Sequence, residues 1–157
     1  MNIIALQPPN HNGIALPIRV QFNKKTATMV ACTVSGNLHE LGIRMVADLF
    51  EIDGWNTYYL GANMPDNHII SALKENKADL LAISASMPDQ VTIAAVIIKK
   101  IRNDASLNRI KVLVGGYPFN QIQDLWKKIG ADGYMNTAKE AIELANKMML
   151  PNYPEPV

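Results

Sequence analysis

The sequence has 157 residues, 48% of them hydrophobic, and its 15 basic and 14 acidic side chains give a formal net charge of +1. This length suits one domain with a hydrophobic core, and the balanced charge argues against a dedicated nucleic-acid-binding protein. The only cysteine, Cys32, lies in an apolar run and is expected to be a buried thiol in a cytoplasmic protein, because a single cysteine allows no intrachain disulfide. We expect neither a secretory signal nor a membrane span, since the apolar runs are far too short for one.

Apolar runs and amphipathic stretches alternate along the chain from Thr26 onward. The runs "MVACTV", "LLAIS" and "IKVLV" are apolar nearly throughout, which is typical of parallel strands covered on both faces. Five consecutive strand–helix units predict an α/β fold with a doubly wound, parallel five-stranded sheet of the flavodoxin-like (Rossmann-like) order 2-1-3-4-5. Strands are predicted at Ala27–Val34, Asn56–Leu60, Asp79–Ser84, Ile110–Val114 and Gly133–Met135, and helices at Leu38–Asp53, Asp66–Lys77, Asp89–Asn103, Phe119–Ile129 and Thr137–Met148.

The sequence divides into a central domain and two short ends. Residues 1–25 contain several prolines and asparagines and are predicted to be an N-terminal extension or linker. Residues 26–150 form the predicted domain. Residues 151–157, "PNYPEPV", are predicted to be a C-terminal tail that is not helical, because prolines interrupt helices.

A ligand of a doubly wound sheet binds beyond the carboxyl ends of the strands, where the strand order reverses. The loops at that edge are "SGNLH" (35–39) after the first strand, "SASM" (84–87) after the third and "GGY" (115–117) after the fourth. These loops are small, polar and rich in glycine, which suits a bulky ligand lying close to the backbone.

The first of these loops allows more than one interpretation. "TVSGN" resembles the phosphate loop of flavodoxins, in which hydroxyls and backbone N–H groups bind the phosphate of FMN at a helix N-terminus. Ser, Gly and Asn are also common turn residues, and the FMN interpretation leaves the other two loops unexplained. A response-regulator receiver would need acidic residues where this sequence has Ser35, Asn37 and Ser84, so that alternative is excluded.

All three loops together resemble the cobalamin (vitamin B12)-binding domain family. The family pattern is Asp-x-His-x-x-Gly, then Ser-x-Leu, then Gly-Gly, and this sequence has "NLHELG" (37–42), "SAS" (84–86) and "GG" (115–116) in the same order. The stretches "YLGANMP", "DLLAISAS" and "GADGYMNTAKEAIELA" fit the same family, so the resemblance extends from about residue 27 to residue 148.

The resemblance implies a role for each matching residue. His39 would displace the nucleotide base of cobalamin and become the lower cobalt ligand through a neutral imidazole nitrogen. Gly42 would leave room for the displaced nucleotide tail beside the first helix, where a Cβ would intrude. Ser84 would offer its hydroxyl to the buried base, and Gly115 and Gly116 would let the tail lie against the backbone.

The sequence departs from the family pattern at two of these positions. Asn37 stands where the pattern has aspartate, and a neutral amide would support the metal-bound histidine less strongly than a carboxylate. We therefore predict that the bond between His39 and cobalt is weaker, by about tenfold in affinity. Ser86 stands where the pattern has leucine and would make the slot for the tail more polar. Because both Asn37 and Ser86 depart from the family pattern, a degenerate domain that no longer binds cobalamin is an alternative interpretation.

The resemblance also implies a helical domain over the upper face of the corrin, which residues 1–25 are too short to form. The upper face is expected to be covered by another domain or protein, unless the sequence is a fragment or the domain works without a cap. A homo-oligomer is compatible with this expectation, whereas direct nucleic-acid or membrane binding is not expected.

Neither a nucleophile–base pair nor paired catalytic carboxylates converge at the predicted crevice, so any chemistry is expected to belong to the cofactor. "HELG" with "YLGANMP" resembles the sensory branch of the family, and the neutral Asn37 suits a ligand that binds reversibly. The sequence therefore favours a cobalamin-binding sensory or regulatory module. The alternatives are a corrinoid methyl-carrier protein of a methyltransferase system, or a haem- or FMN-binding module of the same fold.

Overall fold

The computed structural model describes residues 3–5, 19–21 and 26–149, so most of the predicted extension and the predicted tail at 151–157 lie outside the described residues. Within 1–25, strands β1 (Ile3–Ala5) and β2 (Arg19–Gln21) form an antiparallel pair, which the sequence had not indicated. In the described part of the chain, no helix has both the length and the apolar character needed to cross a membrane.

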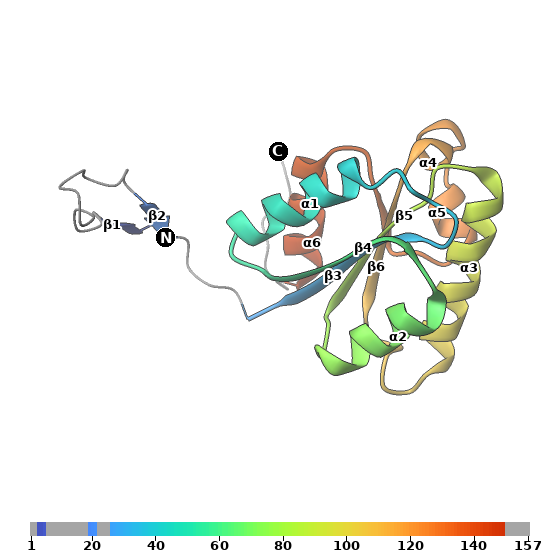
Figure 1. Ribbon diagram of the computed structural model, residues 1–157, viewed down its shortest axis with the longest axis horizontal. Coiled ribbons are helices and arrows are strands. Elements are labelled where there is room, and N and C mark those ends of the chain that lie inside the picture. The colour runs from blue at the N-terminus through green and yellow to red at the C-terminus, as the bar shows by residue number, and fades with distance from the viewer. Residues whose placement is uncertain (1–2, 6–18, 22–25, 150–157) are drawn as a thin grey trace.

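A parallel five-stranded sheet forms the centre of the domain (Figure 1). Its order is β4-β3-β5-β6-β7, which is the predicted order 2-1-3-4-5 when the strands of this sheet are numbered along the chain. The fold class predicted from the sequence is therefore confirmed. The strands are β3 (Thr28–Val34), β4 (Asn56–Met64), β5 (Leu80–Ser84), β6 (Lys111–Gly115) and β7 (Gly133–Met135).

Helices cover both faces of this sheet. Helices α1 (Leu41–Ile52) and α6 (Ala138–Met149) lie together on one face (Figure 1). On the other face lie α2 (Asp66–Glu75) and α3 (Pro88–Asn103), with the short helices α4 (Tyr117–Gln121) and α5 (Leu125–Lys128).

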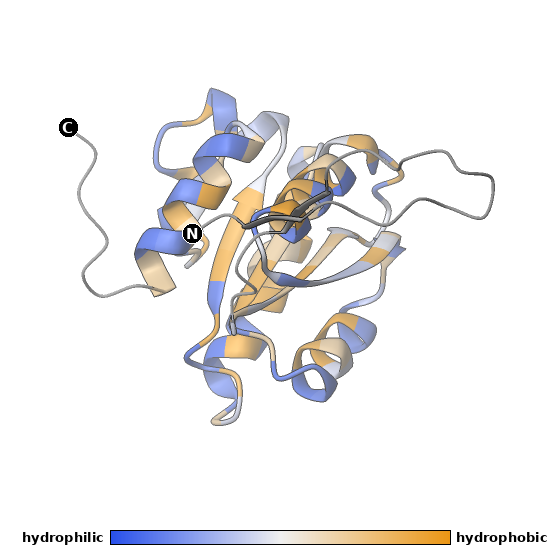
Figure 2. Cartoon of the chain, turned by 90° about the vertical axis from the view of Figure 1, so that its left-hand side faces the viewer, coloured by the Kyte–Doolittle hydropathy of each residue, from blue (hydrophilic) through white to orange (hydrophobic). Residues whose placement is uncertain are grey.

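Every residue of β3 is buried, as its apolar run predicts for a central parallel strand. Successive side chains point to opposite faces, so Val30 and Cys32 pack with the α2–α3 layer, whereas Met29 and Ala31 pack with the α1–α6 layer. Figure 2 shows the hydrophobic strands enclosed between helices of mixed hydropathy.

Most predicted boundaries agree with the structure to within two residues, and three predicted elements differ by more. Helix α1 begins at Leu41 instead of Leu38, and strand β4 continues to Met64 instead of ending at Leu60. The helix predicted over 119–129 is divided into α4 and α5, because the intervening Ile122 is extended and Asp124 adopts a left-handed backbone with φ of 57°. A left-handed residue cannot continue a right-handed helix.

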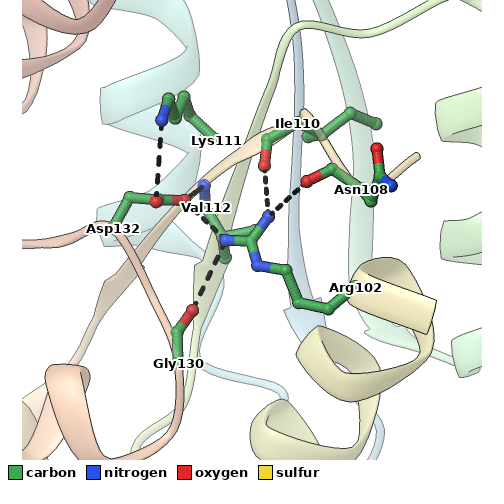
Figure 3. A network of polar contacts seen from close by, with 7 residues as sticks. All are labelled: Arg102, Asn108, Ile110, Lys111, Val112, Gly130 and Asp132. Atoms are coloured by element: carbon green, nitrogen blue, oxygen red, sulfur yellow. Dashed lines mark hydrogen bonds and ion pairs between the residues drawn. The ribbon is translucent and has the colours of Figure 1, made fainter. Parts of the chain in front are cut away.

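A polar network built around Arg102 fixes the amino-terminal edge of the sheet, away from the predicted ligand loops (Figure 3). Its guanidinium donates to the Ile110 carbonyl oxygen at 2.6 Å and pairs with the Asp132 carboxylate at 2.6 Å, with longer bonds to the carbonyl oxygens of Asn108 and Gly130. Asp132 also accepts the backbone N–H of Val112 at 2.8 Å. This network joins the end of α3 to the starts of β6 and β7.

Candidate functional site

The three predicted ligand loops meet at the carboxyl edge of the sheet. The register of the parallel strands pairs Thr33 with Ser84 and Ser84 with Gly115, so β3, β5 and β6 end side by side. The loops that follow these strands are therefore neighbours in space although they are far apart in the sequence, as the doubly wound topology predicts.

An open cleft of about 410 Å³ lies at this edge, between the start of α1, the ends of β5 and β6, and the start of α6. The predicted residues Gly42, Ser84, Gly115 and Gly116 all line it. Sequence reasoning did not assign its remaining lining residues, which are Ile43, Met45, Val46, Tyr117, Asn120, Met135, Asn136, Thr137 and Ala138.

The glycines at the cleft serve different purposes. Gly116 has φ of 118°, and a Cβ there would lie 1.8 Å from the carbonyl oxygen of Ala85. Only glycine fits at this position, because the backbones of Gly116 and Ala85 approach each other closely. At Gly42, by contrast, a Cβ would meet nothing within 4 Å. The absence of a side chain at Gly42 leaves room in the cleft and is not required by the packing of the chain itself.

Asn37 is almost fully buried, with 1% of its surface exposed, and its side chain holds two of the loops together. Its Nδ2 donates to the carbonyl oxygen of Ser84 at 3.2 Å, and its Oδ1 accepts the backbone N–H of His39 at 2.9 Å. The second bond is a local side-chain-to-backbone contact of the kind that competes with helix formation, which accounts for the late start of α1. The hydroxyl of Ser86 also donates to Oδ1, at 3.4 Å.

Ser86 does not line the cleft, although the sequence placed it in the slot for a nucleotide tail. Its hydroxyl turns instead toward the amide of Asn37. The two residues that depart from the family pattern therefore contact each other.

His39 is exposed beside the cleft, and neither of its ring nitrogens makes a hydrogen bond to the described part of the chain. The following residue, Glu40, is held by the hydroxyl of Tyr59, which donates to Glu40 Oε2 at 2.7 Å. Desolvation and the bond to Glu40 raise the pKa of Tyr59 to about 12. Residues 3–5, 19–21 and 26–149 contain no group of three or more His, Cys, Asp or Glu side chains that could hold a metal ion.

Two further polar residues hold the first loop, and sequence reasoning missed both. Asn63, at the end of β4, and Gln90, in the first turn of α3, each bond to the backbone of Gly36. No pattern in the sequence predicts the left-handed backbone of Asn63. Gln90, in contrast, is the third residue of α3 after the N-cap Met87, a position from which a glutamine side chain commonly accepts the backbone N–H of the N-cap residue.

An open, doubly wound parallel sheet with a cleft at its carboxyl edge defines the chain as a ligand-binding α/β domain of the flavodoxin-like class. The family model of the B12 binding domain matches residues 27–145, which is most of the chain. The chain therefore belongs to the B12-binding domain family. Cobalamin, the cofactor expected from the sequence, is the ligand that this family membership supports.

Several proteins similar to this chain are named as corrinoid or cobalamin-binding proteins. The dimethylamine corrinoid protein 3 of Methanosarcina acetivorans is 33% identical over 128 residues, which cover 81% of this chain and 59% of that protein. The solved monomethylamine corrinoid protein of Methanosarcina barkeri has a TM-score of 0.71 and 25% identity, over 81% of this chain and 60% of that one. A cobalamin-binding protein from Desulfitobacterium hafniense has a TM-score of 0.74 at 22% identity, over 79% of this chain and 59% of that one, and shows the shared fold.

The chain spans about three fifths of the length of the curated relatives it matches. These relatives carry names of corrinoid proteins, and they give no support to the sensory role that the sequence favoured.

Proposed function

We propose that this chain is the cobalamin-binding part of a corrinoid protein that carries methyl groups for a methyltransferase system. The observation that supports it most is the similarity to dimethylamine corrinoid proteins across 81% of the chain, with 33% identity in one of them. Carriage of methyl groups was an alternative in the sequence analysis. We now prefer it to sensing, because the similar proteins are named dimethylamine and monomethylamine corrinoid proteins.

The residues at the carboxyl edge fit this cofactor. The cleft of about 410 Å³ has room for a planar base, and Gly42 keeps its wall free of a side chain. We assign the nucleotide tail to this cleft, with the Ser84 hydroxyl and the backbone at Gly115 and Gly116 along its wall. When bound, cobalamin supplies a cobalt centre that can accept and release a methyl group.

His39 is the proposed lower ligand, because its imidazole is exposed three residues before Gly42, which lines the cleft, and its ring nitrogens make no hydrogen bond to the described part of the chain. Asn37 fixes the backbone of the ligand residue, since its Oδ1 accepts the His39 backbone N–H. The amide carries no negative charge with which to strengthen the imidazole as a donor. A weaker His39–cobalt bond therefore stays a prediction, which the absorbance of the cobalamin-loaded protein would test.

A partner is expected to cover the open side of this site. Large apolar side chains on the surrounding loops and on the first turn of α1 are exposed, by 74% at Leu38, 73% at Leu41, 53% at Met87 and 67% at Tyr117. Exposed apolar side chains gathered around a site are typical of surfaces that bind a ligand or another protein. We propose that the corrin and then a methyltransferase or a further domain contact these side chains.

The first experiment tests the cofactor and its ligand. The purified chain is incubated separately with hydroxocobalamin, haem and FMN, desalted, and examined by visible absorbance. Cobalamin should be retained, and His39→Ala should lose the spectrum of a histidine-ligated cobalt, whereas His68→Ala, an exposed histidine of α2, should not. Failure to retain cobalamin, or equal spectra in both variants, would refute the assignment.

A second experiment separates carriage from sensing. The cobalamin-loaded protein is reduced and given a methyl donor together with a purified methylamine methyltransferase, and methylation is followed by absorbance. Transfer of methyl groups onto and off the protein supports the carrier. A change of oligomeric state with light or with the upper ligand, without any transfer, would favour the sensory alternative.

A further inference from the structure

The peptide units on both sides of Gly36 are held by two side chains from different parts of the chain. The N–H of Gly36 donates to Oδ1 of Asn63 at 2.7 Å, and its carbonyl oxygen accepts Nε2 of Gln90 at 3.2 Å. Gly36 itself has a positive φ of 82°, so this turn has few conformations available to it once both bonds are made. The proposed ligand His39 lies three residues further along the chain.

Asn63 holds the turn through its backbone as well as its side chain. Its N–H donates to the hydroxyl of Thr33 at 2.8 Å and to the carbonyl oxygen of Asn37 at 3.0 Å. Asn63 lies within the second of two register shifts between β3 and β4, just before Met64 pairs with Val34. Asn63 takes the left-handed conformation there, with φ of 54°, which asparagine tolerates better than most residues.

Gln90 links the first loop to the loop after β5. The residue is buried, and its Oε1 accepts the backbone N–H groups of Ser86 at 2.8 Å and Met87 at 3.1 Å, which completes the start of α3. Its Nε2 points the other way, across 54 positions in the sequence, to Gly36. The orientation of the amide is unambiguous, because Oε1 faces two donors and Nε2 faces an acceptor.

The hydrogen bond from Gln90 Nε2 to the Gly36 carbonyl oxygen is not needed to cap helix α3. Capping of α3 uses only Oε1, and any acceptor in that place would serve the helix. The extra bond means that the backbone before His39 cannot move away from the loop of Ser86 without breaking a contact of a buried polar group, which carries a substantial penalty.

We propose that Gln90 and Asn63 are positioning residues, which clamp Gly36 from both sides and thereby set the place of His39 relative to the cleft. The clamp itself stands on the hydrogen bonds of this chain, and only its effect on cobalt ligation rests on the proposed function. Neither residue touches the cofactor in this proposal, so both act through the backbone that carries His39.

Gln90→Glu separates positioning from capping. A glutamate keeps the acceptor for Ser86 and Met87, and its charge suits the N-terminus of α3, which offsets part of the cost of the lost donor. It loses the donor to Gly36 and places an oxygen against the Gly36 carbonyl. Gln123→Glu, at an exposed position after α4, is the matched control for the added charge.

Asn63→Gly separates the side chain from the backbone conformation. Glycine adopts a positive φ readily and keeps the backbone N–H, so the bonds to Thr33 and Asn37 should persist while the acceptor for Gly36 is lost. A change in this variant is therefore attributable to the side-chain oxygen alone.

Two measurements decide the proposal. Hydrogen exchange at the Gly36 and His39 amides, followed by NMR without cobalamin, should become roughly 2- to 12-fold faster in both variants, the range expected for one lost hydrogen bond. With hydroxocobalamin, the equilibrium constant for ligation of cobalt by His39, followed by absorbance, should fall by a similar factor. The urea midpoint of Gln90→Glu should lie somewhat below that of Gln123→Glu, because only the former loses a buried donor.

Exchange and ligation equal to those of the Gln123→Glu control would overturn the proposal. So would a Gln90→Glu variant that loses stability without faster exchange at Gly36, because Gln90 would then serve the helix alone. If the unaltered protein fails to retain cobalamin, the proposed function fails, while the exchange measurement still decides whether the clamp holds the loop.

Discussion

Gly42→Ala is expected to stabilise the protein while weakening its hold on cobalamin. A Cβ at this position would meet nothing within 4 Å, and Gly42 is the second residue of α1, so no clash opposes the change. Replacing glycine by alanine inside a helix stabilises it by about 0.5–1 kcal/mol. For an m-value near 2 kcal/mol/M, the urea midpoint should rise by roughly 0.3–0.5 M.

The same methyl group would occupy the cleft in which the nucleotide tail is proposed to lie. Forcing an extra methyl into a filled, well-packed space costs about 1–3 kcal/mol, which corresponds to roughly 5- to 150-fold in affinity. Opposite changes in stability and binding would distinguish a glycine kept for the ligand from one kept for the fold.

The assay combines urea unfolding by circular dichroism with titration of the protein by hydroxocobalamin. Asp48→Ala is the control, because Asp48 is an exposed residue of α1 that does not line the cleft. Unchanged affinity in Gly42→Ala would refute the placement of the tail, and a loss of more than about 1 kcal/mol of stability would refute the reasoning about the helix.

Three further predictions concern the loops and the core. Gly116→Ala should destabilise the fold by about 3 kcal/mol or more in urea unfolding, because the new Cβ would overlap the Ala85 carbonyl and the backbone conformation favours glycine. A loss of stability below about 1 kcal/mol would contradict this prediction. Asn37→Asp should destabilise the protein without cofactor by about 1–3 kcal/mol, since an ionised carboxylate cannot donate to the Ser84 carbonyl. Equal stability of both proteins above neutral pH would argue against it. Burial raises the pKa of Cys32 from 9.0 to about 12, so the contribution of this thiol to stability is complete below pH 9 and is lost as the pH rises toward 12. At pH 8 a disulfide reagent should therefore label Cys32 only as fast as the protein unfolds, and rapid labelling of the folded protein would show that the thiol is accessible.

The strand order and the place of the cleft could be predicted from the sequence because they depend on long patterns. Uninterrupted apolar runs identified the central strands, and the topology then brought the loops after β3, β5 and β6 together. Local details were lost where a single side chain decides the backbone. The side chain of Asn37 binds the N–H of His39 and delays α1, and Asp124 divides a helix by adopting a left-handed conformation. Neither effect leaves a periodic signal.

The same limit explains what was missed at the site. Asn63 and Gln90 act through bonds to a backbone that lies far away in the sequence, and one sequence carries no information about such distant pairs. Ser86 was placed in the slot by analogy with its family position, but its hydroxyl is directed to Asn37.

The Arg102 network has a practical consequence for protein engineering. It ties α3, β6 and β7 together at the edge of the sheet opposite the cleft, through groups that belong to no ligand loop. The exposed residues of the ligand loops, Leu38, Met87 and Tyr117, can therefore be randomised without touching this anchor, and libraries that keep Asn37 and Gly116 should retain a large folded fraction. Libraries that include Arg102 or Asp132 should lose it, and the domain thus offers a scaffold for selecting altered corrinoid preference.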